Sequence, residues 1–234
     1  MAKQLLGKEV NEALVASLKN RTAALQEKGI TATLGIIRLG ENPSDLSYEK
    51  GATKRAEALG IQIVNFVLPE TCTKEELVAV IKKVNEDPAI HGCLMFRPLP
   101  EHLLADQNEI CNLLDPSKDV DSMNHLSNAG VYEGSNDLGY APCTAQACME
   151  ILDYYNIDLK GKNVSIGSAG SGVYFNAMDF LAAYDMTEAD INPQYLSFGD
   201  STDGLKDGKI DAAFIVAGAP TPAITELCTT NHAY

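Results

Sequence analysis

The chain has 234 residues, and 45% of them are hydrophobic, which is enough for a sizeable core in one or two domains. Its 32 acidic residues outnumber 18 basic ones and give a net charge of -14, so we expect neither nucleic acid nor an anionic membrane as a partner. It contains no run of about eighteen apolar residues and no signal-peptide core, so we expect a cytoplasmic protein that binds a cofactor or a small substrate.

Helical and strand patterns alternate through the first half of the chain. Apolar residues at helical spacing predict helices, and β-branched apolar runs predict buried strands. The predicted helices cover 8–28, 45–59 and 73–85, and the predicted strands cover 31–39, 61–68 and 91–96. Strands separated by helices of this length imply right-handed crossovers, so the fold class is α/β with a parallel sheet.

The functional site of such a sheet is expected at the carboxyl ends of its strands. Here those ends are residues 38–42, 68–70 and 96–100, and segment 119–121 is expected as a fourth contributor. Arg38 and Arg97 lie at strand ends, where they are either surface charges or contacts for an anionic tail.

The second half of the chain predicts a smaller α/β unit. Residues 124–140 lack periodicity, which indicates a loop and a boundary between domains at 1–142 and 143–234. The pattern then predicts helices at 144–156, 172–184 and 201–206, strands at 164–166, 195–198 and 210–217, and a last helix from 221. This is a βαβαβ arrangement of the Rossmann-like or periplasmic-binding-protein-like kind. Ile224 and Leu227 on the last helix are expected to be exposed unless something covers them, so a homodimer or a docked lobe is expected.

A glycine-rich turn lies between the first strand and the first helix of this unit. Its small residues are Gly167, Ser168, Gly170, Ser171 and Gly172. Such a turn directs backbone N–H groups and the positive end of a helix at an anion, so it is a candidate site for a cofactor phosphate or a carboxylate. The glycine order is G-x-x-G-x-G, which differs from the dinucleotide order, and glycine that only permits close packing remains the alternative.

Cysteine and histidine spacing predicts no metal site. The six cysteines contain no C-x-x-C pair, and Cys93 and Cys148 lie within apolar patterns that are typical of buried thiols, so disulfides are not expected either. The histidines without metal spacing are His91, His102, His125 and His232.

Several motifs follow one another in a definite order along residues 1–163. They are Gly40-Glu-Asn-Pro-Ser44, Ser47-Tyr48, Gly92-Cys-Leu-Met-Phe-Arg-Pro-Leu-Pro100, Lys118-Asp-Val-Asp121 and Asp158-Leu-Lys-Gly-Lys162. Together they resemble the methylenetetrahydrofolate dehydrogenase/cyclohydrolase family. The resemblance implies that Tyr48 stacks on or positions a folate and that Asp121 contacts the pterin edge. It also implies that the substrate-binding residues Phe96, Pro98, Leu99 and Pro100 line the pocket.

Three positions depart from that family's pattern. The usual catalytic lysine, one helical turn after the tyrosine, is Ala52 here, and Lys50 and Lys54 point to other faces of the helix. The usual glutamine is Phe96, and the usual glycine after the second aspartate is Ser122. Hydrolysis of a methenyl bridge then has no obvious proton carrier, which argues against the cyclohydrolase activity. Hydride transfer needs mainly the orientation of folate against nicotinamide, so a dehydrogenase survives these changes.

The rest of the chain has a second resemblance. The motifs are Val164-Ser-Ile-Gly-Ser-Ala-Gly-Ser-Gly172, Tyr195-Leu-Ser-Phe-Gly199 and Val216-Ala-Gly-Ala-Pro-Thr-Pro222. They resemble a lobe of the TAXI-type solute receptors of TRAP transporters, which implies a carboxylate ligand at the turn. The change of resemblance between 163 and 165 predicts a chimera, engineered or recombined.

Three functions therefore remain open. The first is an NAD(P)-dependent methylenetetrahydrofolate dehydrogenase that uses NADP or NAD at the 167–172 turn. The lack of an acidic residue at the tip of a second cofactor strand weighs against tight dinucleotide binding. The second is a carboxylate-binding module, and the third is a chimera without catalysis.

Overall fold

The computed structural model describes residues 5–133, 139–182, 184, 186–218 and 220–229. The chain divides into two compact units. We call residues 11–131 with 139–143 the front unit, and the described residues before 11 and after 143, with 132–133, the back unit.

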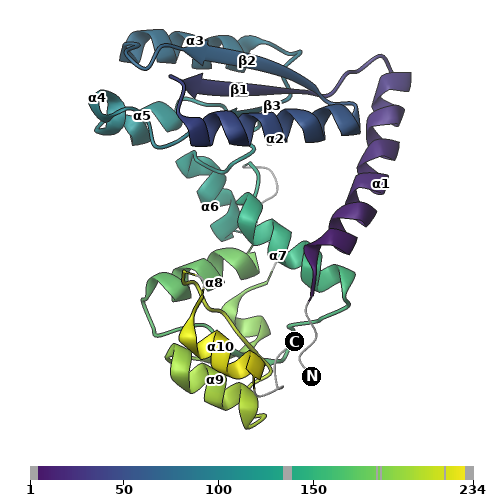
Figure 1. Ribbon diagram of the computed structural model, residues 1–234, viewed down its shortest axis with the longest axis vertical. Coiled ribbons are helices and arrows are strands. Elements are labelled where there is room, and N and C mark those ends of the chain that lie inside the picture. The colour runs from purple at the N-terminus through teal and green to yellow at the C-terminus, as the bar shows by residue number, and fades with distance from the viewer. Residues whose placement is uncertain (1–4, 134–138, 183, 185, 219, 230–234) are drawn as a thin grey trace. The chain divides into compact units, whose positions relative to one another are not determined.

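The front unit is built on a three-stranded parallel sheet (Figure 1). Its strands are β1 (Thr33–Leu39), β2 (Gln62–Leu68) and β3 (Gly92–Met95), in the order β2-β1-β3. Thr33 pairs with Gln62, and Leu34 pairs with Gly92. The central strand β1 is almost wholly buried because it has a neighbour on each side, which explains its continuous apolar sequence.

The three long helices of this half of the chain are α1 (Gly7–Glu27), α2 (Pro43–Leu59) and α3 (Lys74–Glu86). Asn42 caps α2 by accepting a hydrogen bond from the Ser44 N–H, and Gly60 ends the helix in the left-handed conformation. Thr73 and Glu76 form a capping box at the start of α3. The predicted helices and strands of this half are therefore confirmed. Two short helices that the pattern did not predict, α4 (Glu101–Leu104) and α5 (Gln107–Cys111), follow β3.

Segment 119–121 lies alongside β3. Asp119 forms a parallel bridge with Cys93, and the Cys93 N–H donates to the Lys118 carbonyl at 2.6 Å. The Lys118 ammonium also donates to the carbonyls of Val84, Asn85 and Asp87, at the end of α3. Because the bridge is parallel, residues 120–121 run toward the same carboxyl end of the sheet as residues 94–95 of β3. The segment is therefore a fourth contributor at that end, as predicted.

The back unit repeats the architecture on a smaller scale. Its parallel strands β4 (Asn163–Ser165), β5 (Asn192–Gln194) and β6 (Ala212–Ala213) have the order β5-β4-β6. The helices are α7 (Cys143–Tyr154), α8 (Gly172–Ala182), α9 (Phe198–Lys206) and α10 (Pro222–Thr229), and a 3₁₀ turn, η1, covers Glu188–Asp190. Val164, Ile166 and Leu181 are fully buried in its core. The α/β class with parallel sheets in two units is thus as predicted.

Four predictions about local structure were wrong. Residues 125–133 were predicted to be a loop but form α6 (His125–Glu133). Buried Asn124 stabilises the start of this helix by accepting a hydrogen bond from the Leu126 N–H. The strand predicted at 195–198 lies at 192–194, since an edge strand tolerates Pro193 and Ser197 already caps α9. The strand predicted at 210–217 is only two residues long, with Val216 52% exposed. Leu227 is buried, although it was expected at the surface.

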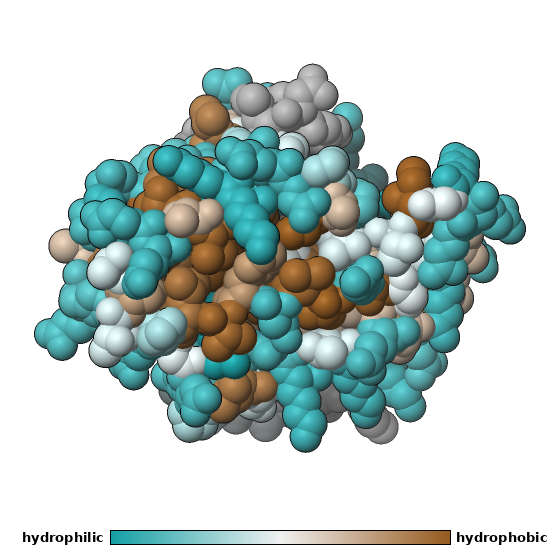
Figure 2. Space-filling model, turned by 90° about the horizontal axis from the view of Figure 1, so that it is seen from above, coloured by the Kyte–Doolittle hydropathy of each residue, from teal (hydrophilic) through white to brown (hydrophobic). Residues whose placement is uncertain are grey.

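Exposed apolar residues remain in both units. Ile224 is 37% exposed in the back unit, and Val67 on the edge strand β2 is 54% exposed in the front unit. The space-filling view shows hydrophobic atoms between hydrophilic ones on one face (Figure 2). A second copy of the chain as a partner stays a prediction. In the described part of the chain no helix is long and apolar enough to cross a bilayer.

The cysteines fall into two groups that a thiol reagent should separate. All six are free; Cys72, Cys93 and Cys111 are buried, and Cys143, Cys148 and Cys228 are exposed, so the prediction that Cys148 is buried was wrong. Burial raises the pKa of the Cys93 thiol to about 12. We expect iodoacetamide at about pH 8 to modify only the three exposed thiols of the folded chain, because the thiolate is the reactive form. Mass spectrometry of peptides measures this, and rapid modification of Cys93 without denaturant would contradict the packing described here.

Candidate functional site

The turn after β1 begins the candidate site in the front unit. Gly40 has a φ of +70°, and a Cβ at this position would lie 2.9 Å from the Cβ of Glu70. The Gly40 N–H donates to the Leu68 carbonyl at 2.9 Å. Only glycine fits both this conformation and this spacing, so the turn holds the ends of β1 and β2 together.

A buried ion pair holds α2 against the sheet. The Arg38 side chain is 8% exposed, and its Nε donates to Glu49 Oε2 at 2.7 Å. Its guanidinium also donates to the Gly40 carbonyl, and Asn65 donates to the other oxygen of Glu49 at 3.3 Å. Arg38 is therefore neither a surface charge nor a free contact for an anionic tail. It positions the first turns of α2, where Tyr48 lies.

Tyr48 projects from α2 beside the end of β3. Its side chain is 65% exposed, and its ring meets that of Phe96 edge to face, with 5.7 Å between centroids. Ala52 lies on the same face of α2, because Tyr48 and Ala52 line one open cavity of about 910 Å³. Lys50 and Lys54 are exposed and do not line this cavity, as the helical spacing predicted. Ala52 thus stands at the position where the family pattern has a lysine, and its methyl group brings no ammonium to this cavity.

Tyr48 and Asp121 open into one cleft, as the resemblance implied. This cleft has a volume of about 280 Å³. Its lining residues are Ser44, Asp45, Tyr48, Leu94, Met95, Phe96, Arg97 and Asp121. Arg97 Nη2 donates to Asp121 Oδ2 at 2.8 Å, so the only guanidinium in the lining is paired with the candidate pterin carboxylate.

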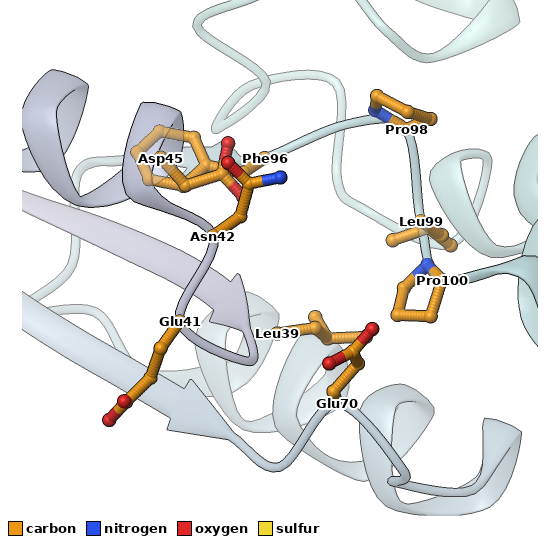
Figure 3. Close-up of a pocket in the computed structure, with 9 residues that line it drawn as sticks. All are labelled: Leu39, Glu41, Asn42, Asp45, Glu70, Phe96, Pro98, Leu99 and Pro100. Atoms are coloured by element: carbon orange, nitrogen blue, oxygen red, sulfur yellow. The ribbon is translucent and has the colours of Figure 1, made fainter.

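The 96–100 loop lines a neighbouring cavity of about 480 Å³ (Figure 3). Phe96, Pro98, Leu99 and Pro100 all contribute to its wall, together with Asn42, Asp45 and Glu70. Figure 3 shows the carboxylate of Glu70 directed toward Pro100, and that of Glu41 directed away from the loop. The Arg97–Pro98 peptide bond is cis, and Gln107 anchors the loop by accepting a hydrogen bond from the Leu99 N–H at 2.8 Å. Of these four residues, Phe96 lines both cavities, and Pro98, Leu99 and Pro100 line only the neighbouring one.

Buried Asp119 fixes the segment that carries Asp121. Its carboxylate accepts hydrogen bonds from the N–H groups of Met123 and Asn124 and from the Ser127 hydroxyl, at 3.1, 2.8 and 2.8 Å. With 0% of its surface exposed, it makes no direct contact with solvent. Its role is to close the turn around residues 119–124, so that Asp121 faces the cleft.

Ser122 departs from the family pattern at a cost to stability. Its φ is +51°, and its buried hydroxyl has no hydrogen-bond partner among the described residues.

We expect Ser122→Gly to raise the free energy of unfolding by about 1 kcal/mol, since it removes left-handed strain and an unsatisfied buried hydroxyl but costs chain entropy. Urea unfolding followed by circular dichroism measures this. Asn156→Gly is the matched control: Asn156 also has a positive φ, +56°, but asparagine tolerates this conformation, so the gain should be smaller. Destabilisation by Ser122→Gly would contradict the account.

The glycine-rich turn lies in the back unit, between β4 and α8. Gly167 and Gly170 both have positive φ, +77° and +72°. A Cβ on Gly167 would lie 2.8 Å from the Cβ of Val173, whereas nothing lies within 4 Å of one on Gly170 or Gly172. Gly167 therefore permits close packing, as the alternative interpretation held, while Gly170 and Gly172 leave open space in front of α8.

The open side of this turn is accessible to an anion. Ser168 and Gly170 are exposed, and the Ser171 hydroxyl accepts a hydrogen bond from the Tyr174 N–H at 3.2 Å. Backbone N–H groups at the start of a helix and its dipole favour an anion there. Ser197, beyond the carboxyl end of β5, caps α9 and its hydroxyl donates to Asp200 Oδ2 at 2.6 Å, so the carboxylate beside that tip is already engaged by the cap. The turn therefore stays a candidate site for an anion such as a cofactor phosphate.

Two residues of the site gained roles that the sequence pattern did not assign. Arg97 was considered a surface charge or a contact for an anionic tail, and it pairs instead with Asp121. Asp119 was identified only as part of a segment, although the spacing of polar residues after it, at 124 and 127, is the signal of a buried carboxylate that closes a turn.

Bacterial relatives match about 70% of the chain. The bifunctional protein FolD of Carboxydothermus hydrogenoformans is 43% identical over 166 residues, which are 71% of this chain and 57% of that protein. The bifunctional protein FolD of Clostridioides difficile is 41% identical over 160 residues, 68% of this chain and 55% of that protein. The chain therefore spans little more than half the length of these relatives. Their names give no support to the prediction that cyclohydrolase activity is lost.

Solved structures match most of the chain. The bifunctional enzyme FolD, methylenetetrahydrofolate dehydrogenase/cyclohydrolase, of Campylobacter jejuni has a TM-score of 0.76 at 29% identity, covering 93% of this chain and 74% of that one. The dehydrogenase-cyclohydrolase of Trypanosoma brucei, complexed with NADP cofactor and inhibitor, has a TM-score of 0.73 at 24% identity, covering 94% and 73%. The second likeness shows a shared fold.

Two family models match the sequence. A model described as the NMT1-like family matches residues 143–234, which is less than half of the chain, and its description names no transporter receptor, so the receptor resemblance and the chimera hypothesis gain no support from it. The model described as the tetrahydrofolate dehydrogenase/cyclohydrolase catalytic domain matches residues 5–121. Since that match covers half of the chain and contains the cleft between Tyr48 and Asp121, the chain belongs to the tetrahydrofolate dehydrogenase/cyclohydrolase family.

Proposed function

We propose that the chain is an NAD(P)-dependent methylenetetrahydrofolate dehydrogenase of one-carbon metabolism. The observation that carries the proposal is the single cleft at the carboxyl edge of the front sheet, which Tyr48, Phe96 and Asp121 line together. An aromatic wall beside a carboxylate suits a ligand that has a flat ring with N–H donors on one edge.

Each residue of the cleft has a role in this proposal. The Tyr48 ring stacks on the folate, and its edge contact with Phe96 keeps it at the mouth of the cleft. Asp121 accepts hydrogen bonds from the pterin edge. Pro98, Leu99 and Pro100 cover the neighbouring wall and exclude water, and Arg38 with Glu49 holds α2 so that the aromatic side chain is presented correctly.

The cofactor belongs to the back unit in this proposal. Backbone N–H groups at Gly170 and Gly172 would hold the pyrophosphate of NADP or NAD, while the Ser171 N–H closes the turn by donating to the Ser168 carbonyl at 3.0 Å. The bound nicotinamide would supply the hydride acceptor. Gly167 shapes the turn through its contact with Val173 and does not touch the cofactor.

The cyclohydrolase half is a separate question with its own assay. The relatives are named bifunctional, whereas the wall around Tyr48 has Ala52 and Phe96 where the family pattern has lysine and glutamine. Another proton carrier is needed if the methenyl bridge is hydrolysed here, because neither of these side chains transfers protons. Both reactions should therefore be measured on the same preparation.

The experiment is oxidation of methylenetetrahydrofolate with NADP and with NAD, followed through the absorbance of the reduced nicotinamide. We expect turnover with at least one dinucleotide and its loss in Tyr48→Ala, with Arg21→Ala on the exposed face of α1 as the unaffected control. Thermal shift with glutamate tests the carboxylate-binding alternative. A shift with glutamate, together with no shift and no turnover with folate, would replace the enzyme proposal by a binding module.

A further inference from the structure

An ion pair with unused hydrogen-bonding capacity lies in the cleft. Arg97 comes from the loop after β3, and Asp121 comes from the segment beside β3. Their side chains are 36% and 33% exposed, so both reach the cavity and remain open to a ligand. Because each is carried by a different segment of the same sheet edge, their spacing is set by the fold and not by local flexibility.

The single contact between the two side chains leaves most of their polar atoms available. The bond joins Arg97 Nη2 to Asp121 Oδ2, and in the described chain neither side chain makes another hydrogen bond. A guanidinium has five N–H donors and a carboxylate accepts at about four positions. The pair therefore offers a row of donors directly beside a row of acceptors.

That row matches one edge of a pterin. A 2-amino-4-oxo ring presents, in order, an oxygen acceptor at position 4, an N–H donor at position 3 and an amino donor at position 2. A carboxylate pairs with the two donors, and a neighbouring guanidinium pairs with the oxygen. A 2,4-diamino ring has an amino donor in place of the oxygen and no hydrogen at position 3. Its 4-amino group would face the donors of the guanidinium, and the carboxylate would lose one of its two donors.

We propose that Arg97 is the specificity-determining residue of the cleft: its guanidinium donates a hydrogen bond to the 4-oxo group of the ligand, while the Asp121 carboxylate accepts hydrogen bonds from the adjacent donors. The inference rests on the proposed folate function and assigns Arg97 a part in it. The ion pair orients both side chains before binding, and Tyr48 and Phe96 provide the aromatic wall on which the ring lies. Selection of a 4-oxo ring over a 4-amino ring needs an oriented hydrogen-bond donor, which neither the charge of Arg97 alone nor its packing would provide.

The test compares folic acid with aminopterin, which differs from it in the 4-amino group. Binding of both to the wild-type chain, Arg97→Leu and Arg97→Lys is measured by calorimetry. We expect the wild type to prefer folic acid and Arg97→Leu to lose about tenfold or more of that preference, since it removes a charged donor to an oxygen. Arg97→Lys should retain part of the preference, because an ammonium is a donor without the planar fork.

Lys74→Leu is the matched control, because Lys74 forms an exposed ion pair with Glu109 in the same unit, outside the cleft. It should leave the preference unchanged, which separates recognition from the loss of a surface ion pair. An unchanged preference in Arg97→Leu, or equal weakening of both ligands, would overturn the role of Arg97 while leaving folate binding intact. If the wild type binds neither folic acid nor the reduced, air-stable 5-formyltetrahydrofolate, the folate function and this inference are overturned together.

Discussion

Asp119→Ala is expected to lower the free energy of unfolding by about 3 kcal/mol or more, because it leaves three buried donors without an acceptor. These are the N–H groups of Met123 and Asn124 and the Ser127 hydroxyl, all bonded to a carboxylate that is 0% exposed. The loss should be visible in urea unfolding followed by circular dichroism, a suitable signal since the chain contains no tryptophan.

The same substitution should weaken folate binding, because Asp121 depends on this turn for its position. Asp119→Asn is the graded control: its amide keeps one acceptor oxygen and the shape of the side chain, so it should lose less stability than alanine. Asp121→Ala is the complementary control, with binding lost and stability little changed, as its carboxylate is one third exposed. Equal stability of Asp119→Ala and the wild type would show that the turn is held by other contacts.

Gly167→Ala is expected to destabilise the back unit by about 2–4 kcal/mol, from left-handed strain and from collision with Val173. Gly170→Ala is the matched variant, because its φ is similar but nothing lies within 4 Å of the added methyl. It should therefore cost only the strain, about 1–2 kcal/mol. Hydrogen exchange of the back-unit amides measures both without assuming that the two units unfold together.

Val173 provides a check on the cause. In a double-mutant cycle, Gly167→Ala combined with Val173→Ala should be less destabilising than the sum of the single changes, since the smaller side chain gives the new methyl room. Additive losses, or equal losses at 167 and 170, would mean that the close approach of Val173 has no energetic weight.

The strands and the long helices of the front unit were predictable from the sequence because local signals and tertiary contacts agree there. Apolar strands such as β1 are buried on both faces, and α2 and α3 carry caps at their starts. In the back unit the signals conflict. Pro193 lies inside β5, and the apolar run of six residues at 212–217 contains only a two-residue strand. Helix α6 was missed because its stability comes from Asn124 and buried Ser127, which are contacts that periodicity does not reveal.

The site was predictable in part for the same reason. Motif order placed Tyr48, Asp121 and the 96–100 loop, and the structure brings them to adjoining cavities. Charge pairing was not predictable, since Arg38 and Arg97 occupy equivalent strand ends and yet one is buried against Glu49 while the other faces the cleft. That difference depends on which side chain of a neighbouring segment comes close, and a single sequence does not contain it.

Calorimetric titration of the chain with 5-formyltetrahydrofolate tests the shared cleft most directly. We expect binding to the wild type and a loss of affinity of about tenfold or more in both Tyr48→Ala and Asp121→Ala, because each removes one wall of the same cleft. Undiminished affinity in both variants would place the folate elsewhere and contradict the account.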